Sequence, residues 1–159
     1  RISRNLIRGS QVAAAAGTAY SPMSRLEELF MLAGNPAPDR SSAELEQALR
    51  TEVAKLREEL ISPEELARVV AQVTATEVYQ QDSLFYQGMR LGILETVGLG
   101  WNKLDDYVQR IQAVTPEQVR EVARKYLTDD RLTVAMLEPL PLEGRRPAAP
   151  GAAMDHAVR

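Results

Sequence analysis

Three segments of the sequence carry the residue pattern that begins an amphipathic helix, and together they constrain the fold more than any other feature. In SSAE, from Ser41 to Glu44, the serine hydroxyl and the glutamate carboxylate can each accept a hydrogen bond from the other's backbone N–H, which is a capping box. SPEE from Ser62 and TPEQ from Thr115 repeat the signal, with proline at the first helical position, where a backbone N–H is not needed.

Each of these starts precedes a stripe of apolar residues spaced three and four positions apart, as one face of a helix requires. The stripes, including that of a shorter helix after GLGWN, consist of Leu45, Leu49, Val53, Leu56 and Leu60; Leu66, Val69, Val70 and Val73; Leu104, Tyr107, Val108 and Ile111; and Val119, Val122, Ala123 and Tyr126. The helix after Ser62 is predicted to be long, and Gly88 and Gly92 are interpreted as a bend in it, with a notch for close packing as the alternative. All four stripes need a common surface to cover.

That common surface is predicted to be a β-sheet. RLTVAMLEP, residues 131–139, is apolar at both alternating sets of positions and stops at proline, which is typical of a buried strand. ELFMLAGNPAP, residues 28–38, has the same character and ends in the turn signal Gly-Asn-Pro. Trp101 is predicted to be a core residue that caps the sheet, with a subunit contact as the alternative. The predicted class is α+β: two layers, with a mixed or antiparallel sheet and helices packed on one face.

The stretch LIRGSQVAAAAGTAY, residues 6–20, has two readings. Alanine is the best helix former, which favours a helix. The tract is short, however, and Gly17 and Pro22 bracket its far end. In a strand, its small side chains would let a helix or a neighbouring backbone approach closely. The residues alone leave helix and strand open.

Composition argues against several functions. The chain has 159 residues, which suits one domain, and 19 basic against 22 acidic residues give a net charge of −3. Without clustered Lys and Arg we expect no nucleic-acid partner, and no apolar run reaches the roughly 20 residues of a membrane span. There is no cysteine, and the one histidine, His156, lies in the segment 140–159, which is predicted to be a disordered Pro/Ala-rich tail. We therefore expect no catalytic residue, metal ligand or cofactor in this chain.

A family resemblance runs in order along residues 1–139. RISRNLIRGSQVAAAAGTAYSP, LEELFMLAGNPAP, ELARVVAQVTATEVYQQDS, GLGWNKLDDYVQRIQAVTPEQVREVARKYL and RLTVAMLEP together resemble the later part of one domain of the insulinase/pitrilysin family of zinc metallopeptidases. The resemblance implies pairs of related α+β domains that face each other around a closed chamber. In the family's catalytic domain, an inverted His-x-x-Glu-His motif binds zinc. Nothing in this chain matches that motif, so the resemblance is to the non-catalytic partner domain.

The resemblance also implies a site. It places the alanine tract in a strand near the substrate wall. The partner domain of this family supplies an arginine and then a tyrosine that reach the peptide backbone; the arginine position falls on Arg8, and the tyrosine position falls on Ala14 or Ala15. The implied partners are a catalytic zinc-peptidase domain or subunit, which would hold the zinc, and a peptide substrate. The implied location is the periplasm.

Other readings stay open at this point. Arg8 could make an ordinary surface ion pair. The chain could be a scaffold protein that has kept the peptidase fold but has no peptidase activity, like relatives in respiratory complexes. It could also be an unrelated helical adaptor. Because the chain begins at Arg1 without a signal peptide, we expect a segment of a longer protein. Strands precede this position in the family, so we expect a sheet that is incomplete at the N-terminus, with an unpaired edge that could support a homodimer.

Overall fold

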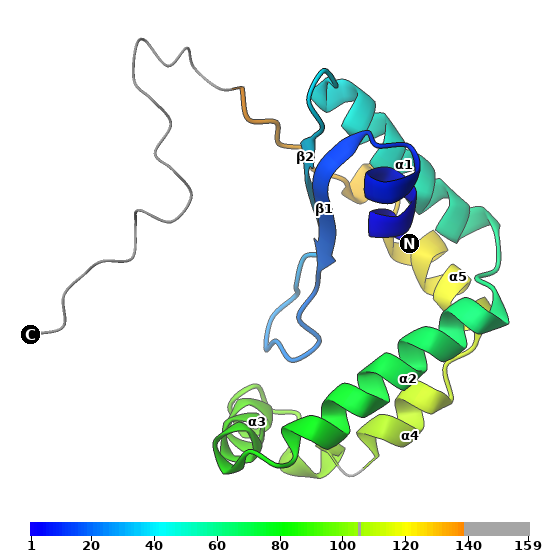
Figure 1. Ribbon diagram of the computed structural model, residues 1–159. Coiled ribbons are helices and arrows are strands. Elements are labelled where there is room, and N and C mark those ends of the chain that lie inside the picture. The colour runs from blue at the N-terminus through cyan, green and yellow to red at the C-terminus, as the bar shows by residue number, and fades with distance from the viewer. Residues whose placement is uncertain (105, 139–159) are drawn as a thin grey trace, which may run out of the picture.

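Figure 1 shows the computed structural model of the chain, which describes residues 1–104 and 106–138. Its elements are the π-helix η1 (Ser3–Gly9), strands β1 (Ala13–Ala19) and β2 (Met31–Pro36), helices α1 (Ser42–Glu58), α2 (Pro63–Gln80) and α3 (Leu84–Thr96), the 3₁₀ turn η2 (Trp101–Leu104), helices α4 (Tyr107–Gln112) and α5 (Pro116–Tyr126), and the 3₁₀ turn η3 (Asp129–Arg131). Helices and an antiparallel sheet confirm the predicted α+β class. The segment 140–159, with His156, lies outside the described residues.

The helices begin where the sequence predicts. Ser41 Oγ accepts a hydrogen bond from the backbone N–H of Glu44 at 3.1 Å, and the Glu44 carboxylate accepts one from the backbone N–H of Ser41 at 2.7 Å. Thr115 and Gln118 form a second capping box at the start of α5. The side chain of Ser62 caps α2 in the same position. These caps satisfy backbone N–H groups that have no partner within the helix, so short local signals fix where each helix starts.

The alanine tract forms strand β1, which pairs antiparallel with β2 in a two-stranded sheet. The register places Ala16 opposite Gly34 and Thr18 opposite Leu32. The second strand ends at Pro36, as the turn signal predicts. The structure thus decides between the two readings of the tract in favour of a strand. A paired strand supplies the ladder hydrogen bonds that outweigh the helix preference of alanine.

One face of the hairpin, here called its inner face, packs on η1 and α1. The buried cluster between these elements consists of Leu6, Val12, Ala13 and Leu45. A Cβ atom at Gly34 would lie 3.0 Å from the carbonyl oxygen of Ala15 and 3.2 Å from Cδ2 of Leu45. Glycine at this position therefore permits the close approach of α1 to the sheet.

The elements form an arch. Figure 1 shows η1, the hairpin, α1 and α5 at one end, and α2, α3 and α4 at the other. Within each end the helices contact one another: α1 packs on α5, and α2 packs on α4. Arg1 and Glu65 form an ion pair between the two ends, with 2.9 Å from Nη2 to Oε2.

The strand predicted for residues 131–139 is not formed. Arg131 belongs to η3, and residues 132–138 have no regular secondary structure and are exposed. Within the described residues, the sheet contains only β1 and β2, so this segment is paired with no strand. A strand gains its stability from ladder hydrogen bonds and cross-strand contacts, so apolar alternation without a pairing partner is not sufficient.

Two further expectations are wrong. The long helix after Ser62 is divided into α2 and α3 at residues 81–83, not bent at Gly88 or Gly92, which both lie inside α3. Ser83 causes the division, because its hydroxyl accepts a hydrogen bond from the N–H of Tyr86 at 3.2 Å and so starts a new helix. Trp101 does not cap the sheet: it lies in η2 at the far end of the arch and is 57% exposed.

Candidate functional site

The site predicted from the sequence is Arg8, and the structure places it in the last turn of η1, just before β1. Its side chain is exposed, and no ion pair or hydrogen bond joins it to another residue in the ranges that the structure describes. Because the guanidinium is free of intramolecular partners here, it can donate to an acceptor outside the described chain. Such an acceptor would be a carbonyl or a carboxylate, for which Arg gives short, charge-assisted hydrogen bonds.

The backbone next to Arg8 is irregular in three successive ways. The helix η1 is a π-helix, a rare form that is often found at functional sites. Gln11 has φ 51°, a left-handed conformation that costs energy for a residue other than glycine. The strand register then shifts between Ala13 and Ala15, which is a β-bulge. Strained backbone of this kind clusters at binding sites, so its concentration here supports a functional reading of the segment.

On the outer face of the hairpin, opposite α1, strand β1 carries only small side chains. Successive strand residues point to opposite faces, and Ala16 packs inward on the core. The outer positions are therefore Ala15, Gly17 and Ala19 on β1, with Asn35, Ala33 and Met31 across from them. Ala14 lies in the bulge, and both Ala14 and Ala15 are exposed. Because these side chains are short, an extended peptide could approach the backbone of β1 closely. Neither Ala14 nor Ala15, however, has the tyrosine hydroxyl that the family resemblance implies at this position.

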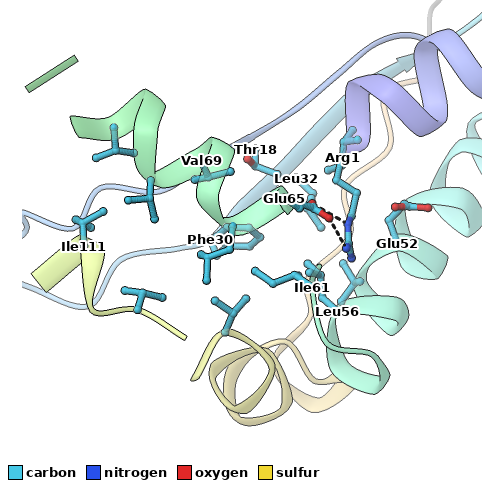
Figure 2. Close-up of a pocket in the computed structure, with 17 residues that line it drawn as sticks. Arg1, Thr18, Phe30, Leu32, Glu52, Leu56, Ile61, Glu65, Val69 and Ile111 are labelled. Carbon is cyan, nitrogen blue, oxygen red and sulfur yellow. Dashed lines mark hydrogen bonds and ion pairs between the residues drawn. The ribbon is translucent and has the colours of Figure 1, made fainter. Parts of the chain in front are cut away.

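A groove of about 400 Å³, here called the inner groove, opens between the inner face of the hairpin and the helices (Figure 2). Its walls are almost entirely apolar. They consist of Thr18, Phe30 and Leu32 from the hairpin side, Val53 and Leu56 from α1, Ile61 from the connection between α1 and α2, Leu66, Val69, Val70 and Val73 from α2, and Ile111, Val114 and Val119 from the segments around α4 and α5. A small-molecule site needs a few polar groups that converge on the ligand. Here the polar groups lie at one end, by Arg1, and face each other instead.

Two carboxylates at that end of the groove are held ionised. Arg1 donates two hydrogen bonds to Glu65, at 3.2 and 2.9 Å, and these lower the pKa of the Glu65 carboxyl. Burial raises the pKa of Glu52, but hydrogen bonds from Lys55 Nζ and Asn5 Nδ2, both 2.8 Å, outweigh it, so the pKa is lowered overall. Neither carboxylate is free to act as a general base near neutral pH.

A second buried charge lies at the other end of the arch. Arg90 of α3 forms an ion pair with Glu77 of α2, and its guanidinium lies 5.3 Å from the ring centroid of Tyr107 and 5.7 Å from that of Tyr86. Burial lowers the pKa of Arg90, although Tyr107 opposes that shift. The charged groups of this cluster are already paired with each other, so the cluster connects α2, α3 and α4 and does not form a ligand site.

Sequence reasoning missed both buried charges, although the signal was present. Glu52 lies three positions after Leu49 and four before Leu56, on the apolar stripe of α1. Arg90 lies four positions before the buried Leu94, on one face of α3. A charge on an apolar stripe indicates a buried group with a specific partner, because an unpaired charge could not be buried there.

The described ranges 1–104 and 106–138 hold no cluster of three or more His, Cys, Asp or Glu side chains arranged to bind a metal ion. Over the same ranges, none of the helices combines the length and the apolar character needed to cross a bilayer.

Comparison with known proteins gives a likeness of fold. No protein family matches the sequence, and no curated protein sequence is significantly similar to it. Among solved structures, a protease from Helicobacter pylori superposes with a TM-score of 0.73 at 18% sequence identity, over 82% of this chain. The chain spans 31% of the length of that protease. At this level of identity the match concerns the fold alone: the chain shares the fold of part of that protein.

Proposed function

We propose that this chain is part of the non-catalytic partner domain or subunit of an insulinase-type zinc metallopeptidase. In this role it forms one wall of the proteolytic chamber and binds part of the peptide substrate, while a separate catalytic domain or subunit holds the zinc. The observation that carries the proposal is the fold match to a protease over 82% of the chain. The ordered resemblance of residues 1–139 to one domain of that peptidase family supports the same conclusion.

Arg8 is the residue proposed to contact substrate. Its exposure, its lack of partners in the described structure and the irregular backbone from η1 to the bulge all support this role. Its guanidinium would hold a peptide carbonyl or the C-terminal carboxylate of a peptide through charge-assisted hydrogen bonds. The proposed location is the periplasm, by analogy with the two-subunit relatives to which the sequence is similar.

The proposal is tested by reconstitution. The full-length protein that contains this chain is purified, combined with its candidate zinc-peptidase partner, and analysed by size-exclusion chromatography and by cleavage of a fluorogenic peptide. We expect a complex and a rate of cleavage that depends on this chain. The proposal would be contradicted if the zinc-peptidase partner did not bind this chain and cleaved the peptide at the same rate with and without it.

A second candidate is a scaffold that has kept the fold and lost the substrate contact. Ala14 and Ala15 favour it, because the family's tyrosine position carries no hydroxyl here. The two candidates differ in the Ala15→Tyr variant, which places a phenol on the outer face of β1. In a substrate-binding partner this change should raise kcat/KM in the reconstituted assay, whereas in a scaffold it should leave the assay unchanged; Ala19→Tyr on the same face is the control.

A further inference from the structure

We infer that Arg4 and Arg8 together form a binding site for a carboxylate of the peptide substrate, either an acidic side chain or the C-terminus. The inference rests on the proposed function, because it names the substrate class of the site that contains Arg8. Arg4 lies four positions before Arg8 in the same helix, η1, and both side chains are exposed. Residues four apart are neighbours on a helix surface. Leu6, midway between them, is buried in the core, so both arginines lie on the side of η1 that faces away from it.

The charge of these two arginines is not balanced by neighbouring residues. Residues 1–26 contain four arginines and no acidic residue. Arg1 is paired with Glu65, whereas neither Arg4 nor Arg8 forms an ion pair within the residues that the structure describes. Like charges four positions apart destabilise a helix. A bound anion would remove this repulsion, so the arrangement suits a ligand better than it suits the isolated fold.

A hydrogen-bond network anchored on a buried carboxylate orients Arg4. The carboxylate of Glu52, a residue only 4% exposed, can only accept, so Asn5 turns its Nδ2 atom toward it and donates at 2.8 Å. The Oδ1 atom of Asn5 then accepts a hydrogen bond from Nε of Arg4 at 3.3 Å. Lys55 Nζ donates to the other oxygen of Glu52 at 2.8 Å. Glu52 therefore fixes Asn5, and Asn5 fixes Arg4, which makes Asn5 and Glu52 positioning residues.

The donors that remain on the two arginines define the ligand. Arginine has five N–H donors, and Nε of Arg4 is the one that has a partner among the described residues, which leaves its terminal nitrogens free. Two parallel N–H groups of a guanidinium match the two oxygens of a carboxylate, and a second guanidinium adds a further charge-assisted donor. A peptide carbonyl has one oxygen and no charge. The pair therefore favours a carboxylate over a carbonyl.

The test compares three peptides that share one sequence and one fluorophore, and measures their binding to the full-length protein that contains this chain by fluorescence anisotropy. The first peptide has a central glutamate and an amidated C-terminus. The second has glutamine at that position and the same amide, and the third has glutamine and a free C-terminal carboxylate. We expect the first or the third to bind about tenfold more tightly than the second, and the tighter of the two identifies the source of the carboxylate.

Variants assign this preference to the two arginines. Arg4→Gln and Arg8→Gln should each abolish most of it, whereas Arg68→Gln, which changes an exposed arginine of α2, should leave it intact. Asn5→Ala should reduce the preference in the unmodified protein but not in the Arg4→Gln background, because Asn5 acts through Arg4. A purely structural effect of Asn5→Ala would instead weaken the binding of all three peptides alike.

The inference would be overturned by equal binding of the three peptides, by no saturable binding at millimolar peptide, or by a preference that survives Arg4→Gln or Arg8→Gln. Tighter binding of a short single-stranded DNA than of the glutamate peptide would also overturn it, because the site would then take phosphate. Reconstitution with the zinc-peptidase partner gives a separate answer. A complex that cleaves peptides without any carboxylate preference contradicts this inference alone, whereas a clear preference in a protein that forms no complex contradicts the proposed function alone.

Discussion

Arg8 shows how far a single residue can be argued from sequence and then from structure. The sequence assigns it only by resemblance, because one arginine before four alanines has no chemistry of its own. The structure adds three independent facts: the side chain is exposed, it has no partner among the described residues, and the backbone around it is strained. An arginine in an ordinary surface ion pair would also be exposed, but it would have a partner.

Replacing Arg8 should therefore affect substrate binding. In the reconstituted peptidase, we expect Arg8→Ala to raise KM about tenfold, which corresponds to the loss of one hydrogen bond from a charged group. Arg68→Ala removes another exposed arginine, from α2, and should leave the kinetics unchanged. Steady-state kinetics on the two variants decide the matter, and unchanged KM in Arg8→Ala would reduce that residue to a structural one.

Gly34 is the residue on which the contact between sheet and helix depends. We expect Gly34→Ala to destabilise the fold by about 1–3 kcal/mol, because the added methyl group would be forced against the Ala15 carbonyl and the Leu45 side chain. Gly17→Ala is the matched change on the partner strand, where a Cβ would meet nothing within 4 Å. Urea unfolding of both variants tests the prediction, and equal midpoints would contradict it.

At the scale of elements, the helix starts and the strand at 31–36 were predictable, whereas the conformations of residues 13–19 and 132–138 were not. The capping boxes at Ser41 and Thr115 use atoms within four residues, so the sequence contains everything needed to form them. Whether residues 13–19 and 132–138 become strands depends on what lies beside them. The alanine tract has β2 as a partner and forms a strand, whereas the more strand-like apolar segment 132–138 has no such partner in the described chain and does not.

Arg90 connects helix α3 to α2 through its ion pair with Glu77 and to α4 through its contact with the Tyr107 ring. Because its ion pair with Glu77 is buried, we expect Arg90→Met to cost about 3 kcal/mol or more by leaving the carboxylate unpaired. The double variant Arg90→Met/Glu77→Leu should recover much of this loss, since it leaves no buried charge. Thermal unfolding followed by circular dichroism compares them, with Arg68→Met as an exposed control. A double variant as unstable as the single one would refute this account.

For the whole molecule, the ion pair between Arg1 and Glu65 links the residues just before η1 to α2 and so connects the two ends of the arch. Hydrogen bonding from Arg1 lowers the folded-state pKa of Glu65 below its unfolded value. A group with a lowered pKa contributes stability that is present above the unfolded pKa of about 4.3 and is lost as the pH falls through the folded pKa.

We therefore expect Glu65→Gln to lower the stability of the chain at neutral pH and to flatten its decline in acid. Urea midpoints measured from pH 7 down to pH 3 test this. Glu58→Gln serves as the control, because Glu58 is an exposed residue at the end of α1. If the Glu65→Gln and unmodified chains lose stability in parallel, the pair does not couple the two ends.

The sequence by itself determined where the helices begin and which of their faces are apolar, because these properties depend on residues close together in the chain. It also indicated a sheet, because several apolar helix faces need a common surface to cover. Tertiary structure alone decided that the alanine tract is a strand, that Ser83 divides the helix after Ser62, and that Trp101 lies exposed at the far end of the arch. It also decided that the apolar stripes are only partly covered. Pairing and burial depend on segments distant in sequence, and one-dimensional patterns do not record which segments meet.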